Sequence, residues 1–143
     1  PFLVQGGTAF AEGIGEKLKP VTVEFPKAVL VATPHCAVPT KDAYAGVKPS
    51  GNVRWEQFRS AWNGTLSFEF YNKFEESVFP KYPMIQDLKN KLENLGAFKT
   101  LMSGSGASVF ALFDSEENAK KALAIIEPTV RFSRITQFKE KLI

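Results

Sequence analysis

The sequence predicts an α+β domain in which helices cover one face of an antiparallel sheet. Its 143 residues suit one compact domain, and a composition that is 44% apolar, with 13 Phe, supplies a hydrophobic core. Segments with strand and helix periodicity alternate, and the last third of the chain has the order strand, strand, helix, strand. We therefore expect one sheet with a layer of helices on it.

Short strands are predicted in the first part of the chain. Gly6-Gly7 suits a tight hairpin turn, because glycine readily adopts positive φ angles, and Gly13-Ile14-Gly15 interrupts the extended run that follows. Residues 28–33, which are rich in β-branched and apolar side chains, are typical of a buried central strand that Pro34 ends. The predicted strands are residues 1–5, 8–12, 17–23 and 28–33.

The middle of the chain is predicted to be helical. The Thr40 hydroxyl can cap a short helix, which Gly46 and Pro49 end. Further on, apolar residues recur at helical spacing, every fourth residue from Leu66 to Val78. The predicted helices are residues 41–45, 53–64, 65–78 and 84–95.

The last third of the chain is predicted to continue the sheet. Ser115 can cap a helix whose first turn carries Glu116 and Glu117, where carboxylates interact favourably with the helix dipole. The predicted elements are strand 99–102, strand 108–113, helix 115–126 and strand 130–138.

Between the first two of these strands lies the glycine loop, Ser103-Gly104-Ser105-Gly106. Its glycines permit positive φ angles, and its successive N–H groups can face an anion. It differs from the phosphate loop and from the dinucleotide fingerprint, because both require a helix after the glycines and here a strand follows. By spacing alone, an anion-binding loop and a simple hairpin turn are equally good interpretations.

Composition limits the classes of partner. The net charge of +3 is mild, and its Lys and Arg are interspersed with Asp and Glu, which favours small anions over nucleic acid. No apolar run approaches the ~20 residues of a membrane helix, so we expect no membrane partner. The single cysteine, Cys36, excludes an intramolecular disulfide and a multi-thiolate metal site, and it favours a cytoplasmic location. We interpret Cys36 and the lone His35 as structural residues.

Several motifs together resemble the GHMP kinase family. Residues 101–113, which include the glycine loop, resemble the C-terminal glycine motif of that family. The other motifs that resemble it in order and spacing are Pro1-Phe2-Leu3, residues 9–16, Val38-Pro39-Thr40, Asn72-Lys73-Phe74-Glu75 and Val78-Phe79-Pro80. The resemblance implies the C-terminal domain of a GHMP kinase, a ferredoxin-like sandwich. Residues 1–26 would end the N-terminal, ATP-binding part with interdomain strands, and residues 27–143 would form the substrate-side domain.

The resemblance also implies an activity. It is the transfer of the ATP γ-phosphoryl group to the 2-hydroxyl of a cytidine-diphosphate methylerythritol, in non-mevalonate isoprenoid synthesis, with Mg²⁺. In the family the catalytic Asp lies just before the position of Pro1, and the catalytic Lys and the main phosphate loop lie further upstream. We therefore expect this chain to be a piece of a longer protein. By itself the chain would hold no catalytic residue and no metal site, and it would bind neither of the cofactors, ATP and Mg²⁺. It would be inactive without its N-terminal domain.

Site residues follow from the same resemblance. Gly13-Ile14-Gly15 would pass close to the diphosphocytidyl group, and Thr40 and Tyr44 would border the cytosine. These residue types suit cytosine binding, because a phenol ring can stack on a base and a hydroxyl can donate or accept a hydrogen bond. Without the resemblance, Thr40 is better interpreted as a helix cap and Tyr44 as a packing residue. The glycine loop would lie across the cleft from the principal phosphate loop.

Two alternatives to the kinase, a ligand-binding module and a nucleic-acid binder, can be distinguished from it by what each requires. A stand-alone α+β ligand-binding or regulatory module, holding a small anion without catalysis, requires this chain to be the whole protein. The kinase requires about 140 or more preceding residues, a domain-sized segment, with a Lys and a glycine-rich loop. A nucleic-acid binder is the weakest alternative, and it requires binding that weakens as salt rises.

Overall fold

The computed structural model describes residues 9–20, 26–48 and 71–138. They fall into two compact units that we describe separately: residues 9–20 belong to the first, and residues 26–48 and 71–137 belong to the second. The predicted division into domains 1–26 and 27–143 stays a prediction. Among the described residues, every helix is too short or too polar to cross a membrane.

The first unit contains an antiparallel hairpin. Strand β1 (Ala9–Glu12) pairs with β2 (Lys17–Pro20), and Glu12 lies opposite Lys17. The turn between them has Gly13 at φ 71° and Gly15 at φ 97°, angles that favour glycine. The sequence predicted that Gly13-Ile14-Gly15 only interrupts an extended run, whereas in the structure these residues form the turn of the hairpin. The predicted turn at Gly6-Gly7 lies outside the described residues.

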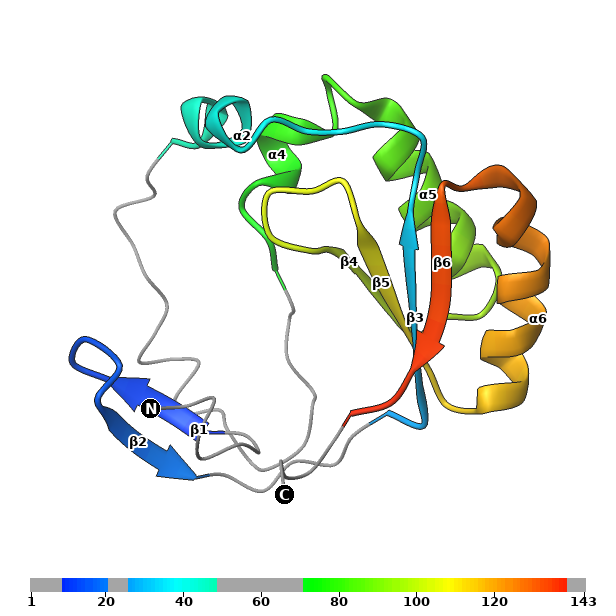
Figure 1. Ribbon diagram of the computed structural model, residues 1–143, viewed down its shortest axis with the longest axis horizontal. Helices are drawn as coiled ribbons and strands as arrows, with labels where there is room; N and C mark the ends of the chain where they lie inside the picture. The colour runs from blue at the N-terminus through cyan, green and yellow to red at the C-terminus, as the bar shows by residue number, and fades with distance from the viewer. Residues whose placement is uncertain (1–8, 21–25, 49–70, 139–143) are drawn as a thin grey trace. The chain divides into compact units, whose positions relative to one another are not determined.

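The second unit is built on a four-stranded antiparallel sheet (Figure 1). The strands are β3 (Ala28–Thr33), β4 (Lys99–Met102), β5 (Val109–Phe113) and β6 (Phe132–Thr136). Their spatial order is β4-β5-β3-β6, so the first and third strands of the unit are central. This is the ferredoxin-like order, and it confirms the predicted fold class.

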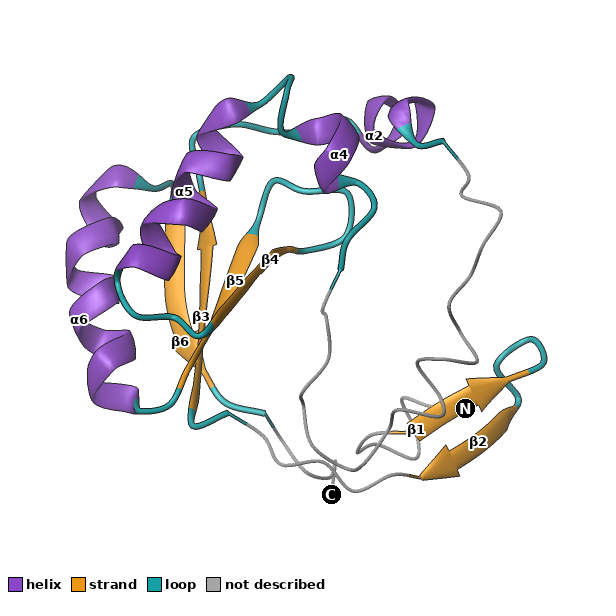
Figure 2. Ribbon diagram, turned by 180° about the vertical axis from the view of Figure 1, so that it is seen from behind, coloured by secondary structure: helices purple, strands orange, loops and turns teal. Residues whose placement is uncertain are grey.

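Two helices cover one face of this sheet. Helix α5 (Pro83–Asn94) contacts β4 and β5, and α6 (Glu116–Ile126) contacts β3, β5 and β6. Figures 1 and 2, taken from opposite sides, show both helices on the same face. The core lies between these layers, where Leu30 and Phe113 of the sheet and Ile85, Leu92 and Ile126 of the helices are fully buried. The 3-10 turn η1 (Glu127–Thr129) follows α6.

Most predicted elements of this unit are confirmed. The strands 28–33 and 99–102 have the predicted bounds, and the predicted helix 84–95 is α5. Ser115 caps α6, because its side chain accepts a hydrogen bond from the N–H of Asn118 (3.2 Å). The last strand is shorter than predicted, since residues 127–129 form the 3-10 turn and β6 ends at Thr136.

Two helical predictions are wrong in part. Helix α2 (Thr40–Gly46) begins one residue early, with Pro39 at the N-cap position and no side-chain cap, so Thr40 is not the cap. Of the predicted helix 65–78, only α4 (Glu75–Val78) is helical among the described residues. Residues 71–74 are not, because the Asn72 side chain accepts the N–H of Phe74 (3.0 Å) and replaces a helical bond. The predicted helix 53–64 lies outside the described residues.

Candidate functional site

The glycine loop connects β4 to β5 as a tight turn. The Ser103 N–H donates to the Ser108 carbonyl (2.8 Å), and the Gly106 N–H donates to the Ser103 carbonyl (3.0 Å). Gly104 (φ 54°) and Gly106 (φ 94°) both have positive φ. Within the part of the chain that the structure describes, the N–H groups of Gly104 and Ser105 have no acceptor. The tip of the loop can therefore donate two successive hydrogen bonds to an anion.

Two hydroxyl pairs lie around the glycine loop, one between the end of β3 and the start of β5 and one between α2 and the loop itself. Thr33 Oγ1 lies 2.8 Å from Ser108 Oγ, and Thr40 Oγ1 lies 3.5 Å from Ser105 Oγ. These contacts follow from the sheet topology, because antiparallel pairing sets the end of β3 beside the start of β5. Of the predicted site residues, the structure thus brings together Thr40 and the glycine loop.

Tyr44 lies one helical turn after Thr40 on α2 and is 64% exposed. Its ring meets the ring of Phe74 at a centroid distance of 4.9 Å and an interplanar angle of 72°. Helix α2 also packs closely on α4, since a Cβ on Gly46 would lie 2.6 Å from the Cβ of Ser77. The Tyr44 ring is thus in contact with a neighbouring ring, while most of its surface stays accessible.

Sequence reasoning missed the role of Asn72 and Glu75, which hold the glycine loop from the other side. The Asn72 side-chain amide donates to the carbonyls of Met102 (2.7 Å) and Gly104 (2.8 Å). Glu75 accepts the Met102 N–H (2.8 Å) and pairs with Lys89 of α5 (2.6 Å). The prediction of a helix over residues 65–78 gave no reason to expect these contacts. An Asn just before an acidic helix start does, however, indicate an Asx-turn.

The other predicted site segment, Gly13-Ile14-Gly15, is the β1–β2 turn of the first unit. Ile14 is fully exposed, and its N–H donates to Glu16 Oε2 (2.7 Å). A Cβ on Gly13 would lie 2.3 Å from Glu16 Oε1. The turn is thus compact and presents an apolar side chain to solvent. The predicted contact of Gly13-Ile14-Gly15 with a diphosphocytidyl group stays a prediction.

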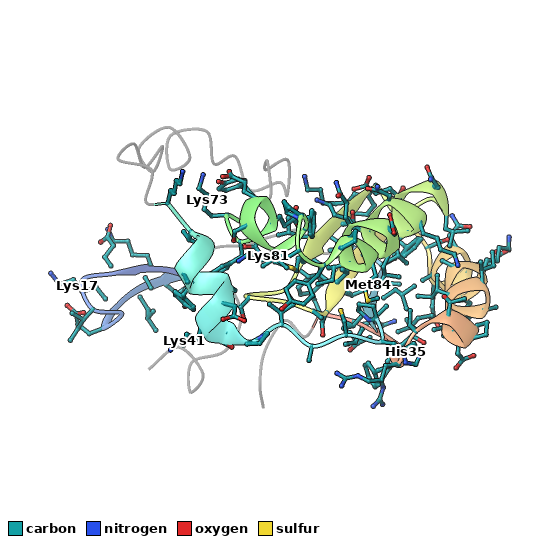
Figure 3. The ribbon with its side chains drawn as sticks, turned by 90° about the horizontal axis from the view of Figure 1, so that it is seen from above. Lys17, His35, Lys41, Lys73, Lys81 and Met84 are labelled. Carbon is teal, nitrogen blue, oxygen red and sulfur yellow. The ribbon has the colours of Figure 1, made fainter. Side chains whose placement is uncertain are left out.

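Outside this site, three features of the described residues bear on chemistry. Burial raises the pKa of the Cys36 thiol, and the Arg131 guanidinium opposes the shift, so the thiol stays protonated at neutral pH. His35 and Met84, both labelled in Figure 3, are among the residues that line a cavity of about 320 Å³, and no glycine-loop residue lines it. Lys73, which precedes α4, pairs with Glu76 (2.6 Å). This hydrogen bond raises the pKa of Lys73 and lowers that of Glu76.

Comparison with known proteins gives one family. Residues 56–128 match the family model described as "GHMP kinases C terminal". Among curated relatives, the 4-diphosphocytidyl-2-C-methyl-D-erythritol kinase of Bacteroides fragilis is 39% identical over 126 residues, covering 84% of this chain and 44% of the relative. The enzyme of the same name from Thermodesulfovibrio yellowstonii is 32% identical over 139 residues, covering 89% and 48%. The chain thus spans about half the length of the curated relatives it matches.

Solved structures resemble the chain as well. A crystal structure of 4-(cytidine 5'-diphospho)-2C-methyl-D-erythritol kinase matches with a TM-score of 0.66 and 26% identity, over 90% of this chain and 48% of that one. A homoserine kinase from Cytophaga hutchinsonii matches with a TM-score of 0.69 at 21% identity, over 95% and 49%, which is a likeness of fold alone.

Proposed function

The chain belongs to the GHMP kinase family, and from this membership we propose that it forms the C-terminal domain of an ATP-dependent kinase. Its acceptor would be the 2-hydroxyl of 4-diphosphocytidyl-2-C-methyl-D-erythritol, in the non-mevalonate route to isoprenoids. Support comes from curated relatives of that name, which align with most of the chain. The observation that carries the proposal is the glycine loop, where the N–H groups of Gly104 and Ser105 have no acceptor among the described residues and the Ser105 hydroxyl lies 3.5 Å from that of Thr40 on α2.

The glycine loop would bind phosphate. The N–H groups of Gly104 and Ser105 lack an acceptor within the described residues, and both suit an anionic oxygen. Because they are backbone donors fixed by the turn, they need no reorganisation when charge develops on a transferring phosphoryl group. ATP supplies that phosphoryl group when bound. This chain's contribution is to orient it toward the acceptor and to neutralise part of its charge.

The remaining parts of the reaction centre would come from the N-terminal domain. Within the described ranges, no group of three His, Cys, Asp or Glu side chains could hold a metal ion. By the family resemblance, we assign the ligands of Mg²⁺, the catalytic base and the principal phosphate loop to that domain. A cytoplasmic location belongs to the same proposal, and the single cysteine of the chain supports it.

Helix α2 and the β1–β2 turn would recognise the cytidine diphosphate. The exposed Tyr44 ring would stack on the cytosine, and the Thr40 hydroxyl would bond to the base or the sugar. Gly13-Ile14-Gly15 would pass along the diphosphate, where glycines permit close backbone approach.

Substitution of Tyr44 tests this recognition in the complete protein. Tyr44→Ala should raise the KM for the cytidine substrate about tenfold, which is ~1.4 kcal/mol and within the range for one base stack, while the KM for ATP stays nearly constant. Tyr44→Phe keeps the ring and should have little effect. Phe98→Ala removes another half-exposed ring, distant in sequence, and serves as the control. An unchanged KM in Tyr44→Ala would contradict the assignment.

A further inference from the structure

We propose that Asn72 is a positioning residue for phosphoryl transfer, because its side-chain amide fixes the glycine loop relative to α2. This inference rests on the proposed function and adds a residue to it. Asn72 would touch neither ATP nor the acceptor. Its effect would pass through the loop whose N–H groups face the phosphate.

Both N–H donors and the carbonyl oxygen of the Asn72 amide form hydrogen bonds in the structure. It donates to the Met102 and Gly104 carbonyls, 2.7 and 2.8 Å away, which lie on either side of Ser103. Its Oδ1 accepts the N–H of Phe74 at 3.0 Å. Asparagine supplies two hydrogen-bond donors and an acceptor on a short side chain, whereas an ionised aspartate can only accept hydrogen bonds. The residue type therefore matches the three bonds that it makes.

The same short segment is anchored to two helices. Phe74 packs against the Tyr44 ring, and Ser77 lies so close to Gly46 of α2 that a Cβ on that glycine would be 2.6 Å from the Ser77 Cβ, so the segment is packed on α2. Glu75 joins the Met102 N–H to Lys89 of α5. Asn72 thus links a loop that would bind phosphate to the helix that would bind the base.

A direct link between the loop and α2 is weaker. Thr40 and Ser105 are separated by 3.5 Å, near the limit for a hydrogen bond, whereas both Asn72 donations are short. The Asn72 bonds are also partly shielded from water at the Met102 end, where Met102 itself is buried. Loss of these bonds should let the loop tip move relative to α2. A small displacement of a positioned phosphate is enough to slow transfer severely.

Asn72→Asp is the sharpest variant. It keeps the shape and the Oδ1 acceptor for Phe74, but it replaces the NH2 group that makes both donations by one carboxylate oxygen, which repels the two carbonyls. Asn90→Asp, at an exposed position on α5, adds the same charge change as a matched control. In the complete protein we expect kcat to fall about tenfold or more in Asn72→Asp, with the KM for the cytidine substrate changed less than about twofold.

Hydrogen exchange separates positioning from general destabilisation. The Ser103 and Gly106 amides should exchange about fivefold faster in Asn72→Asp, while amides of α6 keep their protection. Unchanged exchange in the loop, equal acceleration throughout the second unit, or an unchanged kcat would each overturn the proposal. If the wild type acts on another acceptor, the proposed function fails, and the kcat comparison is then made with that acceptor.

Discussion

Gly106 occupies a position where the structure leaves little room for a side chain. Its φ of 94° is one that other residues rarely adopt. An added Cβ would lie 3.0 Å from the sulfur of Met102 and 3.3 Å from Cγ2 of Val38. Backbone strain and crowding therefore act together at the end of the loop that would bind phosphate.

Gly106→Ala should destabilise the fold by about 2–3 kcal/mol, the sum of a strained φ and a crowded Cβ. Gly96→Ala is the matched control, because Gly96 has φ 92° with nothing within 4 Å of an added Cβ, and it should cost about 1–2 kcal/mol. Urea unfolding of both variants gives the comparison. Equal losses of stability would show that Met102 and Val38 do not crowd the position.

At the scale of elements, the starts of α2 and α6 differ in how they are stabilised. Ser115 caps α6 through its side chain, whereas Pro39 precedes α2 and offers no side-chain acceptor. A proline can stand there because the first N–H groups of a helix have no partner within the helix. Thr40 is thereby released from capping, and its hydroxyl faces Ser105.

This difference predicts the stability of two variants. Ser115→Ala should lower the free energy of unfolding by about 1 kcal/mol, because an N-terminal N–H of α6 loses its acceptor, and Ser115→Asp should restore most of it. Thr40→Ala should cost less than about 0.5 kcal/mol, as expected for an exposed position. Thermal or urea unfolding measures both. A loss in Thr40→Ala as large as that in Ser115→Ala would indicate a cap at Thr40 after all.

Local patterns identified those elements that local interactions determine. The apolar run of β3, the helical spacing of α5 and the capped start of α6 were all predicted. The prediction over residues 65–78 was wrong at 71–74, where apolar spacing continues but the backbone does not stay helical. There the bonds of Asn72 to Met102 and Gly104 compete with the helix, and no local pattern contains partners about 30 residues away.

At the scale of the whole molecule, the sheet order explains why the site was only partly predictable. Antiparallel pairing of β3 with β5 sets Ala32 opposite Val109. The connection from β3 to α2 and the glycine loop therefore lie at the same end of the sheet, as Figure 1 shows. The sequence located the loop by its glycines and Thr40 by resemblance. Their juxtaposition depends on strand order, which spacing within each segment does not specify.

In the proposed function, this domain serves a kinase acting on a cytidine-diphosphate sugar alcohol. Its most direct test supplies the complete protein with ATP, Mg²⁺ and one of three acceptors: 4-diphosphocytidyl-2-C-methyl-D-erythritol, mevalonate or homoserine. ADP release and the phosphorylated product are measured together. We predict ADP release with the cytidine substrate, coupled to phosphorylation of its 2-hydroxyl. Turnover of mevalonate or homoserine with none of the cytidine substrate would contradict the claim.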